Sequence, residues 1–320
     1  MAESLADFVS RRRPDWTRLE QLLERLRAKQ LHLDELTTLD QLYRRAAADL
    51  AHAQAAFPNT DVSRFLNQLC GKAYAGIYRA RPVSLASLRH FFGVTFPAAV
   101  QQTLGYTQLA ASLLLLGVVL GATTVAVDPS SAQRLLGAEL MDFIERRELW
   151  TDVALSTHTP AEMATTIFLN NLRVTFAAFA AGVTLGIGTV LLAVYNGLFL
   201  GAVTAACFQH ELGAGILDFI TAHGPVELSI ISITAGAGLV IGHALIDPGE
   251  RPRAAHVRER ARLAVQLVLG CAPFLVGIGI VEGFVSPGTF FPWPLKAVVG
   301  LASGLGFWRY VLRRRAAAGT

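Results

Sequence analysis

The stretch HGPVELSIISITAGAGLVIGHALID, residues 223–247, decides the fold of this chain. About 20 consecutive apolar residues are enough to cross a bilayer as a helix, and this stretch is that long. It nevertheless opens with two ionisable residues, His223 and Glu227, whose spacing of four places them on one helix face. Such groups inside a membrane face other helices or a water-filled cavity instead of lipid. The stretch therefore predicts a polytopic membrane protein with a polar feature inside its helix bundle.

The composition of the whole chain agrees with a membrane protein. Hydrophobic residues make up 52% and charged residues 16% of the 320 positions, against roughly 25% charged residues in soluble domains. The net charge of +4 comes from residues 1–104, which hold 14 Lys and Arg against 10 Asp and Glu. Beside a membrane domain, such a basic segment favours anionic cytoplasmic lipid as its partner. No nucleic-acid-binding motif accompanies it, so we expect no nucleic-acid partner.

The first third of the chain is amphipathic and contains no long apolar run. Apolar residues recur at helical spacing over residues 14–29, 34–57 and 61–78, which predicts three helices. We expect residues 1–83 to form a cytoplasmic helical segment. Residues 84–104 mix phenylalanine and leucine with arginine, which favours an amphipathic helix in the membrane interface. The alternative for this segment is an ordinary helix of the cytoplasmic part.

Residues 105–320 are predicted to form an all-α transmembrane bundle of about six spans. The apolar blocks that predict these spans cover residues 106–127, 170–194, 197–220, 224–246, 263–283 and 294–312. Residues 197–222 contain several polar side chains, so they could form either a full span or a pair of broken half-helices.

The short connections predict the orientation of the bundle. Residues 247–262 contain five arginines, whereas residues 284–293 contain no Lys or Arg. Basic connections stay in the cytoplasm, so we expect a bacterial cytoplasmic (inner) membrane protein with both termini in the cytoplasm. Residues 128–166 then form an external loop. Within it, residues 131–150 predict an amphipathic helix that either meets a partner or headgroups, or packs on the bundle as a lid.

Each apolar block contains a GxxxG motif, which lets two helices approach closely. The six pairs are Gly117/Gly121, Gly182/Gly186, Gly197/Gly201, Gly238/Gly242, Gly279/Gly283 and Gly300/Gly304. We interpret them as helix-packing positions, within one chain or between chains, so a homodimer is possible.

A polar cluster within the membrane is the main candidate site. Its predicted members are His223, Glu227, His210, Glu211, Gln209 and Asn196. Such groups could relay a proton, bind a cation or hydrogen-bond a lipid headgroup; alternatively, they join neighbouring helices. A second pair, Asn170 and Asn171, precedes the second apolar block and is predicted to cap a helix at the membrane edge or to hydrogen-bond across helices.

The chain lacks the usual sequence signatures of catalysis. HExxH, GxSxG and P-loop motifs are absent. His223 and Glu227 could supply two metal ligands and His210 and Glu211 could supply more, but nothing in the sequence fixes a third ligand. The three cysteines are isolated, which supports neither a disulfide framework nor a CxxC metal site. We therefore expect no catalytic residue, metal or cofactor, and an intramembrane hydrolase is the least favoured hypothesis.

Several elements together resemble one family. They are an FF…FP segment at residues 91–97, Asn170-Asn171, Asn196-Gly197, His223-Gly224 with Glu227, and Asp247-Pro248-Gly249. In this order they resemble the stage II sporulation protein M family of integral membrane proteins. The resemblance implies a helical membrane protein without established enzymatic activity, similar to a scaffold that holds peptidoglycan-degrading partners at the septal membrane.

From the residues and the resemblance we expect a non-enzymatic membrane scaffold. It would contact membrane lipids and assemble cell-envelope or membrane-remodelling proteins. The alternative is a transporter or channel for an ion, a proton or a lipid-like solute, which would use the polar cluster.

Overall fold

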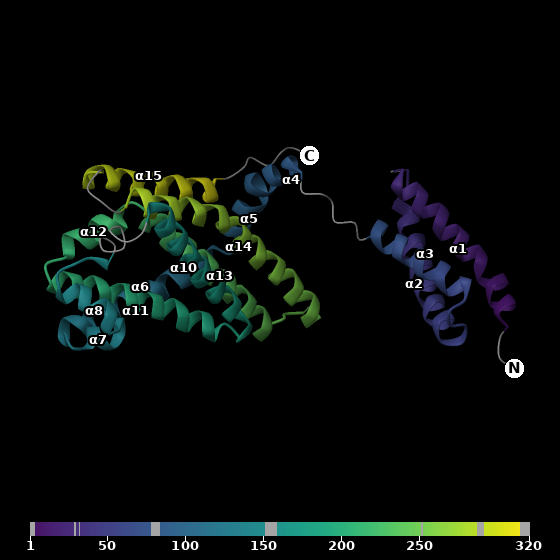
Figure 1. The fold of residues 1–320 in the computed structure, drawn as a ribbon, viewed down its shortest axis with the longest axis horizontal. Coiled ribbons are helices and arrows are strands. Elements are labelled where there is room, and N and C mark those ends of the chain that lie inside the picture. Colours follow the sequence, from purple (N-terminus) through teal and green to yellow (C-terminus); the bar gives the residue numbers. More distant parts are fainter. Residues whose placement is uncertain are drawn as a thin grey trace. The chain divides into compact units, whose positions relative to one another are not determined.

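The computed structural model describes residues 4–28, 30–31, 33–77, 84–150, 159–250, 252–286 and 291–313. Its chain divides into two compact units, Met1–Ser84 and Leu85–Thr320. The regular elements within the described residues are all helices, which confirms the predicted all-α fold (Figure 1).

Three helices form the first unit: α1 (Leu5–Arg27), α2 (Leu33–Ala56) and α3 (Asp61–Ile77). Their core is made of large apolar side chains, among them Phe8 and Trp16. The indole Nε1 of Trp16 also donates a hydrogen bond of 2.8 Å to the buried carboxylate of Asp49.

The prediction that the first helix starts near Pro14 was wrong, because α1 begins at Leu5 and Pro14 lies inside it. The hydroxyl of Ser4 accepts a hydrogen bond from the backbone N–H of Asp7 and so caps the helix. The helix therefore begins nine residues before the predicted start. Phe8, which is buried, extends the apolar face toward this cap.

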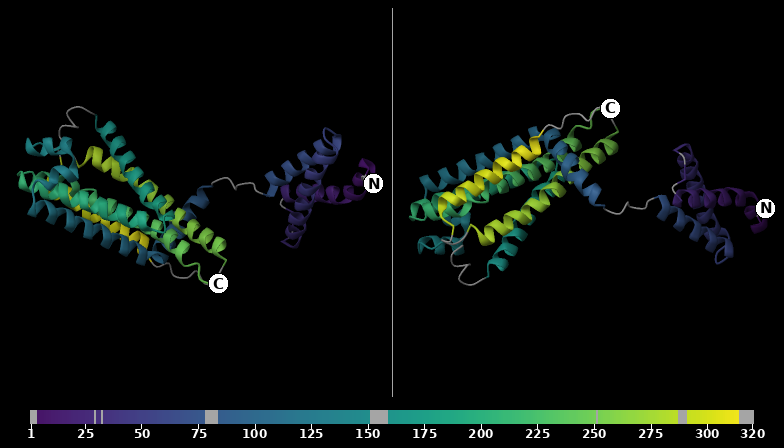
Figure 2. Two further views of the ribbon diagram at one scale, coloured as in Figure 1. Left: turned by 90° about the horizontal axis from the view of Figure 1, so that it is seen from below. Right: turned by 90° about the horizontal axis from the view of Figure 1, so that it is seen from above.

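Six helices of the second unit are long and apolar enough to cross a membrane, as predicted. They are α6 (Leu104–Val127), α10 (Pro160–Ala180, extended by the 3-10 turn η2, Ala181–Val183), α11 (Ile187–Gln209), α13 (Gly224–Ile246), α14 (Arg253–Phe284) and α15 (Trp293–Leu312). Figures 1 and 2 show these helices running side by side.

The predicted boundaries of the second and third spans were wrong. The chain reverses between α10 and α11 at residues 181–186, where Gly186 has a φ of +81°, a conformation that glycine adopts without strain. Asn196 and Gly197, expected between two spans, therefore lie in the middle of α11. Sequence blocks missed this turn because its residues, AGVTLG, are themselves mostly apolar.

Helix α13, the stretch that predicts the fold, lies at the centre of the bundle. In its most apolar window 78% of the residues are buried, compared with at most 44% in the other five spans. It packs against α6, α10, α14 and α15. Its small residues, such as Gly236 and Gly238, allow this many neighbours to approach one helix.

The segment before the first span is a nearly continuous helical rod. It consists of α4 (Leu85–His90), the π-helical turn η1 (Phe91–Thr95) and α5 (Phe96–Gln102). α5 packs on α14 and α15, and its Gln101 side chain donates a 2.8 Å hydrogen bond to the carbonyl of Val311. α4 instead exposes Leu85 and Leu88. An interfacial position of α4 remains a prediction.

The described residues between α6 and α10 include two short helices. Residues 131–150 contain α7 (Ser131–Leu136) and α8 (Ala138–Glu145), which are separated at Gly137, where φ is +85°. Buried side chains of α8, including Ile144, pack with buried residues of α11. The part of the predicted external loop that is described thus packs on the bundle. Residues 151–158 of that loop lie outside the described residues.

Residues 197–222 form the second half of α11 and a short helix, α12 (Gly213–Thr221). The segment is therefore part of a full span followed by one additional helix, and not a pair of half-helices. α12 returns the chain to the start of α13 and so positions His223.

Candidate functional site

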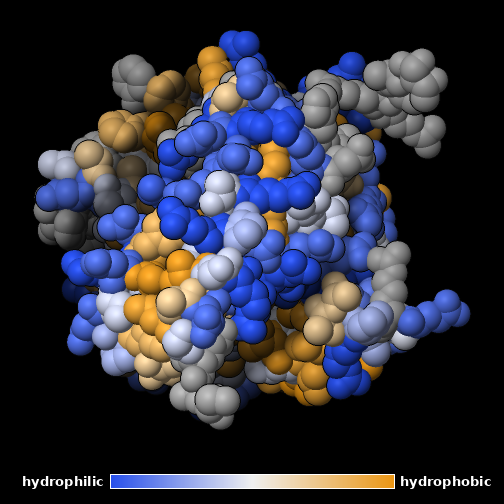
Figure 3. All heavy atoms as spheres, turned by 90° about the vertical axis from the view of Figure 1, so that its right-hand side faces the viewer, coloured by the Kyte–Doolittle hydropathy of each residue, from blue (hydrophilic) through white to orange (hydrophobic). Residues whose placement is uncertain are grey.

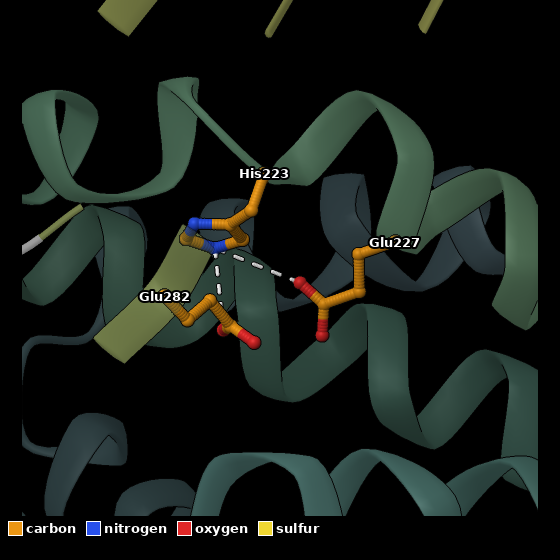
Figure 4. A group of neighbouring side chains, drawn as sticks. All are labelled: His223, Glu227 and Glu282. Carbon is orange, nitrogen blue, oxygen red and sulfur yellow. Dashed lines mark ion pairs between the residues drawn. The ribbon is translucent and has the colours of Figure 1, made fainter. Parts of the chain in front are cut away.

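Three ionisable side chains meet at the end of the bundle that also contains α12. His223 immediately precedes α13, Glu227 lies one turn further along the same helix, and Glu282 comes from the last turn of α14. Figure 4 shows the imidazole and both carboxylates pointing toward one another.

The contacts among these three side chains are close but longer than typical hydrogen bonds. Nε2 of His223 lies 3.6 Å from Oε2 of Glu227 and 3.5 Å from Oε1 of Glu282. Nitrogen–oxygen hydrogen bonds in proteins are usually about 2.9 Å long. One nitrogen and two oxygen atoms, one from each residue, all lie within 4.8 Å of one another. The arrangement leaves space for a small cation or a shared proton between them.

Neighbouring polar groups fix the orientation of the cluster. Nδ1 of His223 lies 2.8 Å from Oγ of Ser286, so Nε2 is the ring nitrogen that faces the carboxylates. Nδ2 of Asn171, on α10, donates a 3.1 Å hydrogen bond to Oε2 of Glu282. The ring of Phe219, on α12, packs edge-on against the imidazole, with 5.2 Å between the two ring centroids. Residues of four helices, α10, α12, α13 and α14, therefore form and orient the site.

The cluster borders a cavity of ≈ 480 Å³. Its polar lining residues are Asn170, Asn171, Asn196, Thr221, His223 and Glu227, and the remainder of the lining is mostly apolar. The side chain of Glu227 is 18% exposed, whereas those of His223 and Glu282 are 2% and 6% exposed. Glu227 is thus the member of the cluster through which the cavity reaches the site.

A buried lysine supports the same region from α15. Lys296 is fully buried, forms an ion pair with Asp218 of α12, and donates a 2.8 Å hydrogen bond to the carbonyl of Ser286. Ser286 therefore joins two polar groups, through its hydroxyl to His223 and through its carbonyl to Lys296. Lys296 is not among the residues predicted from the sequence, although a single lysine at the start of an apolar block is a usable signal.

The structure brings together only part of the predicted polar cluster. Asn196 lines the cavity with His223 and Glu227. In contrast, Gln209 donates to the carbonyl of Val125, Nδ1 of His210 lies 2.9 Å from the carbonyl of Ala206, and Glu211 forms an exposed ion pair with Arg147. Gln209 is the last residue of α11, His210 and Glu211 follow it, and α12 separates all three from His223.

Glu282 is the member of the cluster that the sequence patterns did not indicate. It lies in the last turn of α14 and is buried beside His223. Distant segments of the chain supply the two residues, so no local spacing indicated their contact.

Asn170 and Asn171 lie within the candidate span Ala164–Val183. Their helix begins earlier than predicted, because Thr159 and Glu162 form a capping box at its start. The structure assigns Asn171 the other predicted role, a hydrogen bond across helices to Glu282.

The glycine pairs lie mainly at contacts between helices of the same chain. A Cβ atom on Gly197 would lie 2.0 Å from the carbonyl oxygen of Leu114, and one on Gly117 would lie 2.1 Å from that of Val194. Gly121 likewise contacts α11, and Gly201 contacts α6. Gly182 and Gly186 contact α13. From α13, Gly238 contacts α10 and Thr189, and Gly242 contacts residues 185–186.

The remaining glycine pairs are less uniform. Gly300 packs against the backbone of Thr221, Gly304 against Pro225, and Gly279 against Phe168. Gly283 is buried at the end of α14. These contacts show that the glycines are helix-packing positions within the bundle of one chain.

Two family models match the chain. The model described as stage II sporulation protein M matches residues 110–287, which is more than half of the chain and includes the three-residue cluster. A domain of unknown function (DUF8413) matches residues 6–79, which correspond to the three helices of the first unit. No curated protein and no solved structure matches.

Proposed function

Starting from the fact that this chain belongs to the stage II sporulation protein M family, we propose that it is a non-enzymatic membrane scaffold. In this role it assembles cell-envelope or membrane-remodelling partners in contact with membrane lipids. Six apolar helices make it a multi-pass membrane protein. We place it in the bacterial inner membrane with both termini in the cytoplasm, because the arginines of residues 247–262 favour that side. The His223 cluster then lies toward the outer face.

A groove in the first unit is the observation that carries the scaffold proposal. The groove has a volume of ≈ 1320 Å³ and follows α1. Apolar side chains such as Leu5 and Val9 line it together with Arg13 and Arg18, and with Arg25, which pairs with Glu35 of the same lining. A groove with a mixed apolar and basic lining accepts an amphipathic helix, and the charges of Arg13 and Arg18 favour an acidic one. The matching partner is an acidic amphipathic helix of another envelope protein.

On the face drawn in Figure 3, hydrophilic side chains predominate and hydrophobic side chains gather in separate patches. The first unit also has its own core, so the groove has a rigid support that does not depend on the membrane helices.

Co-purification of the full chain from its native membranes in mild detergent tests this proposal. We expect the double variant R13E/R18E to recover at least tenfold less of a partner that contains an acidic amphipathic segment. The matched control is R64E/K72E, which reverses two exposed charges of the same unit outside the groove. Recovery of the chain without any partner, or equal losses in both variants, would contradict the scaffold function.

A transporter or channel is the second candidate function, because ionisable groups inside membrane proteins often mark pathways. The cavity beside Glu227 is the observation that favours it. Flux of protons or cations into liposomes that contain the purified protein should then fall severalfold in Glu227→Gln. Wild-type flux no higher than that of empty liposomes would eliminate this candidate and leave the scaffold proposal untouched.

A further inference from the structure

We propose that His223, Glu227 and Glu282 bind one Zn²⁺ ion, with Nε2 of the histidine and one oxygen of each carboxylate as ligands. The proposal concerns a site distinct from the groove of the first unit. It also revises the expectation from sequence that no metal binds, because Glu282 supplies the third ligand beside His223 and Glu227.

The distances between the ligand atoms fit a zinc site. Zinc binds histidine nitrogen and carboxylate oxygen at about 2.0–2.2 Å, and tetrahedral geometry at these lengths separates ligand atoms by roughly 3.4 Å. Nε2 of His223 lies 3.6 Å and 3.5 Å from the nearest oxygens of Glu227 and Glu282. The two carboxylate oxygens lie within 4.8 Å of each other, so a side-chain rotation that brings them closer would complete the coordination.

The charges of the cluster also fit a divalent cation. Two carboxylates that point at one another inside a protein are unfavourable unless a cation or protons compensate them. With a neutral imidazole, two carboxylates and one Zn²⁺ sum to zero net charge. Lys296, a buried cation in the same region, does not serve this purpose because it is engaged with Asp218 and the carbonyl of Ser286.

The groups behind the ligands have the arrangement that supports metal sites. Metal-binding histidines usually hydrogen-bond through their other ring nitrogen, and ligating carboxylates are hydrogen-bonded in turn. Ser286 contacts Nδ1 of His223, and Asn171 donates to the oxygen of Glu282 that points away from the imidazole. Both ligands are therefore oriented before any ion binds (Figure 4).

Three protein ligands leave one position of a tetrahedral zinc ion open. Glu227 borders the ≈ 480 Å³ cavity, so that position lies on the cavity side. Water or another oxygen donor from the cavity would occupy it. Asn170 and Asn196, which line the same cavity, provide amide groups for such a ligand.

Metal titration of the full-length, untagged protein in detergent tests the site. After treatment with a chelator, we expect the wild type to bind one equivalent of Zn²⁺ per chain and to melt at a higher temperature when the ion is added. Co²⁺ as a probe should show ligand-field bands without a thiolate charge-transfer band, which would exclude the cysteines as ligands.

Variants connect the binding to these residues. Glu227→Gln and Glu282→Gln should weaken Zn²⁺ binding at least 100-fold, and Asn171→Ala should weaken it about 10–100-fold because it removes a supporting hydrogen bond. Glu211→Gln, an exposed carboxylate at the same end of the bundle, should bind as the wild type does.

Two outcomes would overturn the proposal. A folded wild type that takes up no stoichiometric Zn²⁺ would show that protons alone compensate the carboxylates, and this result does not depend on any variant. Equal affinity in the wild type and in Glu227→Gln would place the ion elsewhere. Neither outcome affects the co-purification test of the scaffold function.

Discussion

The two units of this chain bury their helices by different means. The first unit packs large side chains such as Phe8, Trp16 and Leu66 into its core. The centre of the second unit, α13, is instead rich in glycine, alanine and serine. In water the hydrophobic effect makes the burial of large apolar groups favourable. In lipid this contribution to the free energy is absent, so close backbone contact and interhelical hydrogen bonds stabilise the bundle.

Each unit also buries polar side chains, but the number of helices that they connect differs. In the first, Asp49 accepts a hydrogen bond from Trp16 and pairs with Arg12. In the second, polar contacts connect Asn171, Glu282, His223 and Ser286 across three helices and the residues that follow α14. A single buried pair fixes one helix contact, whereas a network that crosses the bundle can also form a site.

The largest loss of stability is expected from a substitution at a glycine where the backbones of two helices of the bundle are in contact. Gly197→Leu should prevent α6 and α11 from packing, because even a Cβ atom would lie 2.0 Å from a carbonyl oxygen of α6. The cost should exceed the ~3 kcal/mol of ordinary overpacking. Yield of monodisperse protein in detergent measures it. Gly277→Leu is the control, since no atom lies within 4 Å of a Cβ there; similar losses in both variants would refute the close-packing explanation.

In the first unit, the size of a side chain should matter most. Phe8→Ala removes a buried ring that packs against Trp16, His52 and Phe57. We expect a loss of about 3 kcal/mol in the free energy of unfolding of this unit. Hydrogen exchange of the full chain should accelerate in residues 4–77 and stay unchanged in 159–250. Tyr74→Ala, at an exposed position, serves as the control, and acceleration in both ranges would contradict independent cores.

A smaller effect is expected from the buried lysine of the bundle. Lys296→Met keeps the apolar stem but removes the ion pair with Asp218 and the hydrogen bond to Ser286. Leaving these partners unsatisfied costs ~1–3 kcal/mol. Thermal unfolding in detergent should show the lower melting temperature, while Lys72→Met, at an exposed position, should not. An unchanged melting temperature in Lys296→Met would mean that solvent replaces the lost contacts.

The smallest effect concerns the exposed end of α6. The Ser130 hydroxyl and the Arg134 guanidinium hold the pKa of Asp128 below its ordinary value. The ionised carboxylate therefore stabilises this turn at pH values above about 4, and the contribution is lost as the pH falls through the lowered pKa. The protection of the amides of residues 129–136 against hydrogen exchange, corrected for the intrinsic exchange rate at each pH, should fall below that pH in the wild type. In Asp128→Asn it should be low throughout; a pH-dependent step that persists in this variant would point to another group.

The fold was largely predictable from the sequence because hydrophobic length and composition act locally. Six spans, three amphipathic N-terminal helices and the central importance of residues 223–247 all follow from such patterns. The boundaries of α10 and α11 did not, because the turn at residues 181–186 is as apolar as the helices beside it. Charge and polarity mark turns in water, and a turn covered by other helices lacks that mark.

The candidate site was only half predictable. The sequence by itself determined that His223 and Glu227 share a helix face, because helical spacing of four allows no other arrangement. Only the tertiary structure brought Glu282 and Asn171 to them and moved Gln209, His210 and Glu211 away, because those positions depend on how α10, α12 and α14 pack around α13. Local periodicity fixes neighbours within one helix, whereas a contact between residues more than fifty positions apart is decided by packing.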